Sequence, residues 1–477
     1  MEQLTMKWYT REFIYSHLPV VVQSAIVAGY GRRIYRQRFG PGYEELAGFL
    51  ERSERDNPDR RQEYQEKRLQ ALIRHAYRTV QYYRRVMDER GLTPGDISTG
   101  ADLVKLPLLT KEDVRLAGDD LLSTSFSKRS LRAATTSATT GSPLTVLWDG
   151  SVALMNHACY MRVRRWAGLP FGRPYATLQG RLLTPLRQKK PPFWRDNPRW
   201  KQTFFSTMHM SEENLPHYVE KFRRAGIVHL EAYPSTAFVL ARYLQATDDR
   251  LPLERVITTG EPLLPAHRAL LEERFQAEAF DAYGQAERVV FSSECEEHDG
   301  HHLFDEYGIT EFVSEDGSRV PDGSLGLLAG TSLHNFAMPL LRYVCGDVGS
   351  SSGGSCACGR TLPKLDGLTS RAGDIVVAPD GRMIPSIMLS WAVRWLSNVD
   401  RWQIRQDAAD ELRVLVVTRS ELSEEEVDRV KGHFAKRMGP SMRVTVERVE
   451  EIPRTAIGKL RHVVSTVPLP LGGERPE

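Results

Sequence analysis

Apolar and polar positions alternate along the chain in ways that predict most of its secondary structure. Residues 66–91 are predicted to form one long amphipathic helix, because apolar side chains recur there at spacings of three and one; these are Leu69, Leu72, Ile73, Ala76, Tyr77, Val80 and Tyr83. From residue 100 to residue 370, short apolar runs alternate with helical patterns and glycine-rich turns. Strands are predicted at His229–Tyr233, Arg255–Thr259 and Ala279–Tyr283, and helices at 235–246 and 265–275. This alternation favours an α/β fold with mostly parallel sheets covered by helices.

The last hundred residues have the pattern of a small α+β domain. Glu411–Thr418 is a strongly apolar predicted strand, and Arg443–Glu447 alternates like a half-buried strand. Between them, Ser423 and Glu426 have the spacing of a capping box that begins a helix. We expect a helical N-terminal extension over 1–60, a large domain over 61–371 and a small mobile domain over 372–477. The polar stretch 350–355 is expected to be a flexible loop.

Composition excludes several classes of protein. The chain has 477 residues, 41% hydrophobic and 26% charged, with a net charge of +3, so we expect a globular cytoplasmic protein that does not bind nucleic acid. Its five cysteines do not suggest a secreted disulfide framework. The apolar stretch Leu18–Tyr30 is too short to cross a bilayer and precedes Arg32 and Arg33. We expect it to dock on the main domain; weak contact with a membrane surface is the alternative.

Four motifs carry candidate nucleotide chemistry. The hydroxyl-rich segment 135–141 can wrap phosphate oxygens with its side chains and backbone N–H groups, although such a segment can also be a linker. Asp281–Glu287 offers an aromatic ring for a purine and a carboxylate for Mg²⁺, and Tyr343–Asp347 offers an aspartate for ribose hydroxyls. Pro453–Arg461 places a lysine beside a glycine turn. Each motif alone also fits a solvated turn.

In this order, the motifs resemble those of the adenylate-forming superfamily of acyl-CoA synthetases and adenylation domains. Within it, residues 65–475 resemble the phenylacetate–CoA ligase branch, including its capsule-biosynthesis members. The resemblance implies a ligase that activates a carboxylic acid with ATP to acyl-AMP, releases pyrophosphate and transfers the acyl group to the thiol of CoA. Transfer to an amine or a carrier-protein thiol is one alternative, and a non-catalytic binding protein on the same fold is another. A homodimer is also open.

The resemblance implies a role for each matching residue. Lys459, Glu287 and Arg371 would be catalytic, with Glu287 as the Mg²⁺ ligand and Lys459 reaching the carboxylate and the α-phosphate. Asp374 would be the hinge. The implied nucleotide contacts are Thr135, Thr136, Ser137, Thr139, Thr140, Gly141, Gly260, Glu261, Pro262, Ala282, Tyr283, Gly284, Asp347 and Arg371.

Three positions depart from the pattern of the superfamily. Ala138 replaces a glycine of the phosphate loop, and Cys345 replaces a threonine of the ribose motif. Val377–Arg382 has the pattern of a plain turn where other members carry a glycine-rich segment that helps to place the thiol. The resemblance therefore supports adenylation more closely than the CoA step.

Two further groups of residues are candidates for a metal site and an acid pocket. Cysteine and histidine suit tetrahedral Zn²⁺, and we predict a structural zinc bound by Cys295, His302, Cys356 and Cys358, with His298 as the alternative to His302. Unligated cysteines are the other interpretation.

The resemblance places Tyr233, Pro234 and Ser235 at the acid pocket. There, Tyr233 and Phe238 would suit an aryl or compact acid, although buried aromatic residues commonly belong to the hydrophobic core alone.

Overall fold

The computed structural model describes residues 14–135, 144–179, 181, 183–185, 188–207, 209–210, 212–369, 375–379, 383–385, 399–418, 420–453, 461 and 463–467. Contacts between Cα atoms group these residues into two compact units. The first unit takes its described residues from 14–45 and 164–281, and the second takes them from 46–163 and from 282 onward. Each unit has a buried apolar cluster of its own.

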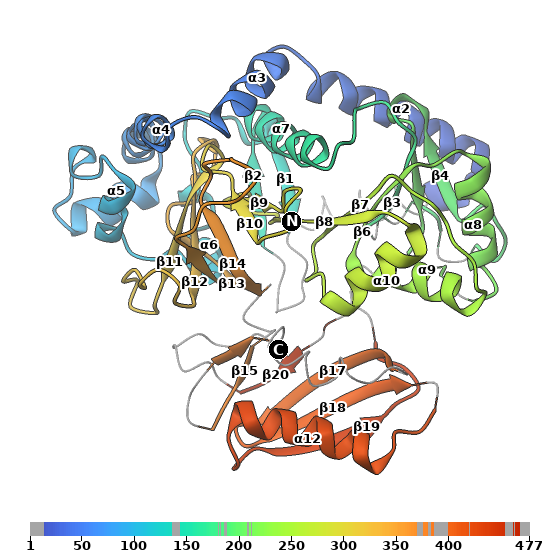
Figure 1. Cartoon of the computed structure of the whole chain (residues 1–477). Helices are drawn as coiled ribbons and strands as arrows, with labels where there is room; N and C mark the ends of the chain where they lie inside the picture. Colours follow the sequence, from blue (N-terminus) through green and yellow to red (C-terminus); the bar gives the residue numbers. More distant parts are fainter. Residues whose placement is uncertain are drawn as a thin grey trace. The chain divides into compact units, whose positions relative to one another are not determined.

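The first unit is built from strand–helix–strand repeats (Figure 1). Its strands follow the order β8-β7-β6-β3-β5-β4, and β5, β3, β6 and β7 run parallel. The strands are β3 (Tyr175–Leu178), β4 (Trp194–Asn197), β5 (Gln202–Phe205), β6 (His229–Ala232), β7 (Arg255–Thr259) and β8 (Glu278–Gly284), whose last three residues belong to the second unit. The helices are α2 (Val20–Arg38), α8 (Leu215–Arg224), α9 (Pro234–Ala246) and α10 (Pro265–Phe275).

The elements predicted for this region are confirmed. Strand β7 has the predicted bounds, β6 is one residue shorter than predicted at its carboxyl end, and β8 is one residue longer at each end. Helices α9 and α10 begin with Pro234 and Pro265 at their first positions, where the missing N–H and the fixed φ of proline favour a helix start. The carboxyl ends of β6 and β7 are therefore followed by tight turns into helices.

In the second unit the sheet is antiparallel, in the order β11-β12-β13-β14-β10-β9-β8. The expectation of mostly parallel sheets thus describes the first unit, while the α/β fold class is confirmed for the chain. The strands are β9 (Phe291–Ser293), β10 (His301–Leu303), β11 (Gly308–Val313), β12 (Gly326–Ser332), β13 (Tyr343–Ser352) and β14 (Lys364–Thr369), with a separate hairpin of β1 (Arg132–Thr135) and β2 (Thr145–Trp148). The helices are α3 (Tyr43–Ser53), α4 (Pro58–Thr79), α5 (Gln81–Glu89), α6 (Lys111–Ala117) and α7 (Gly150–Trp166).

Two sequence predictions for this unit are wrong. The single helix expected over 66–91 is divided into α4 and α5, because Val80 is extended (φ −118°, ψ 110°) and caps α4 with its N–H bonded to Ala76. Val80 is buried, so packing of this β-branched residue outweighs helix continuity. The loop expected over 350–355 is strand at 350–352, where β13 pairs with β14.

The C-terminal residues form a small α+β domain, as expected (Figure 1). Its sheet has the order β19-β18-β17-β20, with α12 (Glu424–Met438) between β18 and β19. Both hydrogen bonds of the predicted capping box between Ser423 and Glu426 are present. The strands are β17 (Val399–Ala408), β18 (Glu411–Thr418), β19 (Arg443–Arg448) and β20 (Val463–Ser465), and β15 (Ile375–Val377) pairs with β16 (Met383–Pro385) in a hairpin. The expected domain boundary at 371–374 lies outside the described residues.

Candidate active site and metal centre

The nucleotide-binding candidates of the second unit meet at Tyr283 and Asp347. The Tyr283 hydroxyl, at the end of β8, donates a hydrogen bond to Asp347 Oδ2 on β13. Gln285 Nε2 donates to the same hydroxyl, and Cys345 Sγ lies 3.7 Å from it. Burial and the charge of Asp347 raise the pKa of Tyr283, so its hydroxyl remains a donor. The tyrosine therefore fixes one oxygen of the Asp347 carboxylate.

A turn at Gly346 gives Asp347 its position. Gly346 has φ +78°, a conformation that glycine adopts without strain, and a Cβ atom there would meet nothing within 4 Å. The preceding residue, Cys345, donates its thiol hydrogen to the Leu328 carbonyl at 3.1 Å. Burial raises the pKa of Cys345, so this thiol is protonated at neutral pH. Cysteine thus serves here as a small neutral residue.

A second carboxylate, Glu287, belongs to the same unit. Tyr343, the first residue of β13, donates its hydroxyl hydrogen to Glu287 Oε1 at 3.0 Å. Glu287 is buried, and carboxylate oxygens of this kind are the ligands that Mg²⁺ prefers. The next residue, Arg288, has φ +60°, a strained conformation for a residue with a side chain. Its guanidinium lies over the Trp148 ring, 3.9 Å from the ring centroid, which favours this turn.

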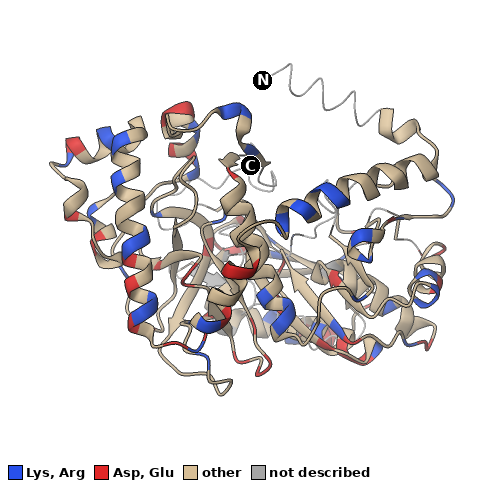
Figure 2. Cartoon of the chain, turned by 90° about the horizontal axis from the view of Figure 1, so that it is seen from above, with Lys and Arg blue, Asp and Glu red and all other residues tan. Residues whose placement is uncertain are grey.

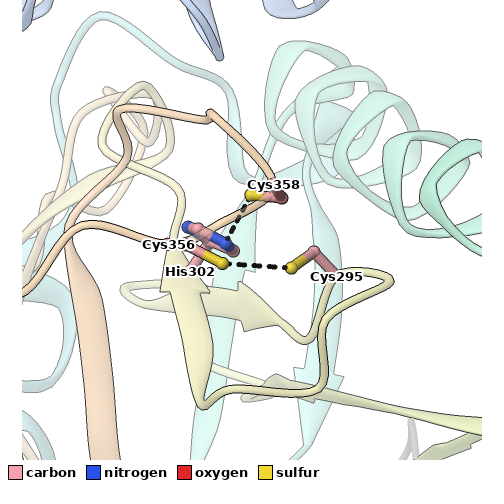
Figure 3. A group of neighbouring side chains, drawn as sticks. All are labelled: Cys295, His302, Cys356 and Cys358. Carbon is pink, nitrogen blue, oxygen red and sulfur yellow. Dashed lines mark hydrogen bonds between the residues drawn. The ribbon is translucent and has the colours of Figure 1, made fainter.

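The four favoured zinc ligands lie together, in a buried group whose ligand atoms are all within 4.8 Å of one another (Figure 3). Cys295 Sγ and Cys356 Sγ are 3.6 Å apart, and Cys358 Sγ is 3.4 Å from His302 Nε2. Bonds of ~2.3 Å to sulfur and ~2.0 Å to nitrogen predict tetrahedral edges of about 3.8 and 3.5 Å. A disulfide would need ~2.05 Å, and all five cysteines are free. These two distances therefore fit two edges of a tetrahedral zinc site.

Groups around this cluster orient its ligands. His302 Nδ1 lies 3.4 Å from the Leu362 carbonyl, which leaves Nε2 for a metal ion. Burial alone would raise the pKa of Cys358, but hydrogen bonds from Arg360 and from the thiols of Cys356 and Cys295 together lower that pKa, which favours the thiolate. Arg55 Nη1 donates to the Cys358 carbonyl at 3.1 Å. The alternative ligand, His298, is not in the group, and its Nδ1 faces Glu294 Oε2 at 3.3 Å.

Two further described candidates, the buried Ala282 and the exposed Gly284, lie in the last residues of β8 and belong to the second unit. The remaining described candidates belong to the first unit. Gly260 follows β7 with φ +80° and leads to the buried Glu261 and the half-buried Pro262. Tyr233 caps α9, with its N–H bonded to the Leu178 carbonyl at 3.1 Å, and Pro234 follows it. Phe238 stacks on His267 with ring centroids 4.1 Å apart. Tyr233 and the segment from Gly260 to Pro262 lie in the turns after β6 and β7, while Pro234 and Phe238 lie in α9.

Several predicted residues lie wholly or partly outside the described part of the chain. They are Thr136, Ser137, Thr139, Thr140, Gly141, Arg371, Asp374 and Lys459, together with the side chains of Thr135 and Ser235. Their roles stay predictions, as do the roles of the described candidates.

Sequence reasoning missed the residues that hold these candidates in place. Gln285 lies two residues from Tyr283 inside a recognised motif, so its proximity in sequence was an available signal. Tyr343 lies in another recognised motif, but its contact with Glu287 spans 56 residues. Arg55 gave no signal, because its partner Cys358 is distant in sequence. Arg360 was within reach of sequence reasoning, because it follows Cys358 by two residues and donates its backbone N–H to that thiol at 3.4 Å.

Comparison with known proteins agrees with the resemblance. Residues 376–466 match the family model of the CapK C-terminal domain. The chain is 24% identical to protein CapK of Staphylococcus aureus over 469 residues, covering 95% of this chain and 99% of that protein. It is 26% identical to a phenylacetate–coenzyme A ligase of Thermus thermophilus over 426 residues, covering 84% of this chain and 95% of the relative.

A solved structure shows the same fold. The crystal structure of 2-hydroxyisobutyryl-CoA ligase in the postadenylation state, in complex with 2-HIB-AMP, matches with a TM-score of 0.70. The match covers 87% of this chain and 91% of the other, at 21% sequence identity. The expected fold is therefore confirmed.

Proposed function

We propose that this chain, which belongs to the adenylate-forming superfamily in its phenylacetate–CoA ligase and CapK-like branch, is an acid–CoA ligase. It would activate a carboxylic acid with ATP to acyl-AMP and pyrophosphate, and then pass the acyl group to the thiol of CoA. The observation that carries the proposal is the convergence of two separate motifs in the second unit. Tyr283 holds Asp347, and Tyr343 holds Glu287, so the implied ribose and metal carboxylates are each positioned by the other motif.

Asp347 and Tyr283 would bind the nucleoside. The Asp347 carboxylate would accept hydrogen bonds from the ribose hydroxyls, and charge-assisted bonds of this kind are among the stronger ones. Tyr283 holds that carboxylate in one orientation before ATP arrives, which lowers the entropic cost of binding. Gly260, Glu261 and Pro262 would contact the adenine.

The first half-reaction requires two anions to approach each other. A carboxylate oxygen would attack the α-phosphorus, the bond to the β-phosphate oxygen would break, and pyrophosphate would leave with the electron pair. Glu287 would hold Mg²⁺, which when bound supplies positive charge against the phosphates. Lys459 would offset the charge on the carboxylate and α-phosphate, and the segment 135–141 would hold the β- and γ-phosphates.

In the second half-reaction, the CoA thiol would attack the acyl carbon, AMP would leave with the electron pair, and the thiol proton would pass to water. Phenylacetate–coenzyme A ligases among the relatives support CoA as acceptor. Transfer to an amine or to a carrier-protein thiol is the second candidate. It is favoured by the sequence of Val377–Arg382, which lacks the glycine-rich segment that other members of the superfamily carry there; residues 380–382 lie outside the described part.

Tyr233 and Phe238 support an aryl or compact acid. Tyr233 lies at the end of β6 and Phe238 one helical turn into α9, on the segment that the resemblance assigns to the acid pocket. Aromatic walls favour a flat acid over a long acyl chain.

The cysteine cluster would hold a structural zinc ion. Its donors come from the chain after β9, from β10 and from the loop before β14, so a bound ion would join three segments of the second unit. Four protein ligands leave no open coordination position, which excludes direct contact between this metal and the substrate. Its contribution would therefore be to folding.

Acid-dependent exchange between ATP and labelled pyrophosphate, measured with and without CoA, tests the function. A screen of aryl and short acids should find exchange without CoA and thioester formation with it. Exchange without thioester would favour an amine or carrier protein as acceptor. No exchange with any acid would favour the third alternative, a binding protein on this fold.

A further inference from the structure

Helix α2 exposes large apolar side chains along one face. Val21, Val22, Ile26 and Tyr30 are 80%, 41%, 46% and 61% exposed, and they make up half of the large apolar side chains exposed in the described chain. Val22, Ile26 and Tyr30 are four residues apart and so lie in one row along the helix. We call this row, with Val21, the apolar face of α2. The apolar face of an amphipathic helix is normally turned toward a core or a partner.

The opposite face of α2 is already packed, which fixes the direction in which the apolar face points. Buried Gln23 accepts a hydrogen bond from Arg195 Nε at 2.9 Å. Trp200 Nε1 donates to the Gly31 carbonyl at 2.9 Å, and a Cβ atom on Gly31 would overlap the Asn197 side chain. Rotating α2 to hide its apolar face would therefore break these contacts within the first unit.

Positive charge lies at one end of this face. Leu18–Gly31 contains no charged residue, whereas Arg32, Arg33, Arg36 and Arg38 follow at once, and α2 has no acidic residue. Figure 2 shows this as a helix without red bands whose blue bands gather at its carboxyl end. Arg199, also exposed, lies over the Tyr35 ring at 3.8 Å from the centroid. The basic end of α2 is thus Arg32, Arg33, Arg36 and Arg199.

Helix α4 has a different kind of surface. Helix α4 turns charged side chains to solvent, among them Glu63 and Lys67, which form an ion pair of 2.6 Å. Arg32, Arg33 and Arg36 form no such pair within the described chain. A partner that binds both the exposed apolar row and the unpaired arginines must itself be both apolar and anionic.

We propose that the apolar face and the basic end of α2 dock this protein on an anionic lipid surface. A helix with an apolar face and a cationic flank lies in the plane of a bilayer interface, with its apolar side chains among the acyl chains and its arginines at the headgroups. Tyr30, at the junction between the two parts, is a residue type favoured at that depth. No described helix is long and apolar enough to span the bilayer, so the contact is peripheral.

A second copy of the chain fits this surface less well. Pairing α2 with α2 would bury the apolar rows against each other, but α2 itself has no acidic residue to offer the four arginines of the basic end. An acidic protein would satisfy the arginines through its carboxylates. However, the apolar core of a protein–protein interface is normally surrounded by a rim of polar side chains. An acidic partner would not by itself explain why the apolar face of α2 lacks such a rim.

Binding of the full chain to vesicles tests the proposal. The protein is sedimented with vesicles of phosphatidylcholine alone, or of phosphatidylcholine with about one-third phosphatidylserine. The test variant is Gly29→Glu, because Gly29 lies on the exposed side of α2 and a Cβ atom there meets nothing within 4 Å. The matched control is Gly432→Glu, which makes the same change at an exposed, equally open position of α12.

We expect the wild type and Gly432→Glu to bind the anionic vesicles and not the neutral ones. Gly29→Glu should bind at least tenfold more weakly, at an unchanged melting temperature. The double variant Arg32→Gln with Arg33→Gln should bind the anionic vesicles about 25-fold more weakly, which is about fivefold for each arginine. Added salt should also weaken the binding of the wild type to these vesicles.

Three results would overturn the proposal. One is wild-type protein that does not bind anionic vesicles, and another is equal binding by Gly29→Glu and Gly432→Glu. The third is a wild-type dimer by light scattering that Gly29→Glu converts to a monomer without any vesicle binding, which would assign the face to a second copy of the chain. Pyrophosphate exchange should be unchanged in all these variants, so failure of this proposal is distinct from failure of the proposed function.

Discussion

The Tyr283 hydroxyl on β8 donates a hydrogen bond to Asp347 on β13, although β9, β10 and β14 lie between these strands in the sheet. In a flat sheet, four strand spacings would separate the two residues by about 19 Å. The sheet of the second unit must therefore curl until β8 and β13 face each other. Curling brings the two central nucleotide motifs together, so the site depends on the sheet as a whole.

Tyr283→Phe should weaken the use of ATP without unfolding the protein. The ring stays, but the Asp347 carboxylate loses the donor that orients it. We expect kcat/KM for ATP to fall about tenfold in pyrophosphate exchange, and about a hundredfold in Asp347→Asn. Tyr218→Phe is the control, because it removes another buried tyrosine hydroxyl, which bonds the Ser206 carbonyl at 2.7 Å. An equal loss in that control would mean that Tyr283 acts only through stability.

Glu287→Gln should change the requirement for magnesium. A neutral amide is a poorer ligand for a hard cation than a carboxylate, so the Mg²⁺ concentration for half-maximal exchange should rise at least tenfold. Tyr343→Phe keeps the carboxylate but removes the 3.0 Å hydrogen bond that orients it, and should give a smaller rise. If Glu287→Gln lowers the rate equally at every Mg²⁺ concentration, the assignment of this residue to the metal is wrong.

The cysteine cluster should bind one zinc ion per chain. Cys295→Ser and Cys356→Ser should lose the metal in elemental analysis, and their melting temperature should fall by several degrees. Cys159→Ser and Cys345→Ser change cysteines outside the cluster and should keep the zinc. His298→Ala should also keep it, whereas His302→Ala should not. Zinc retained in Cys356→Ser would rule out this ligand set.

Stability should depend on His334 in mildly acidic solution. Arg68 Nη2 lies 3.5 Å from Nδ1, and Nε2 lies 2.7 Å from the Glu306 carbonyl, an arrangement that suits a neutral ring. Burial, with Arg68, lowers the pKa of His334 from 6.5 to about 4. Between pH 6.5 and pH 4, His334 is protonated in the unfolded chain but neutral in the folded chain. The free energy of unfolding is therefore at its full value above pH 6.5 and falls as the pH is lowered toward 4.

The contribution of His334 to this loss is up to about 3 kcal/mol. His334→Gln should flatten the dependence of the free energy of unfolding on pH between 6.5 and 4, measured by urea denaturation. The same slope in wild type and variant would mean that other groups cause the acid sensitivity.

Lys459→Ala should separate the two half-reactions. If this lysine serves only adenylation, exchange should fall by 10²–10³-fold, a typical loss for removing a group that stabilises developing charge. Conversion of added acyl-AMP and CoA to thioester should be nearly unchanged. Equal loss in both half-reactions would contradict this division of roles.

The elements that were predicted well have local causes. Strands β7 and β18 and helix α10 have exactly the predicted bounds, because their apolar runs end at turn and capping residues. The break at Val80 was not visible, because the apolar spacing continues through it and only burial in the tertiary structure explains the extended residue. The strand at 350–352 was missed because its serines pair with β14 through the backbone.

Those residues of the candidate site that lie together in short sequence motifs could be predicted from the sequence. The set Cys295, His302, Cys356 and Cys358 was chosen by ligand chemistry, and the fold brings those four together. Groups that hold the candidates, such as Tyr343 and Arg55, could not be assigned, because their partners are distant in sequence and are brought to them only by the fold. Long-range pairs of this kind leave no periodic pattern in the sequence.

The measurement that tests the central claim most directly follows the oxygen of the carboxylate. An acid found in the exchange screen is labelled with ¹⁸O in both carboxyl oxygens and converted to product in one turnover with ATP. Attack on the α-phosphorus predicts that one ¹⁸O atom appears in AMP and none in pyrophosphate. Label in inorganic phosphate, with ADP as the nucleotide product, would show activation through an acyl phosphate and would contradict the account.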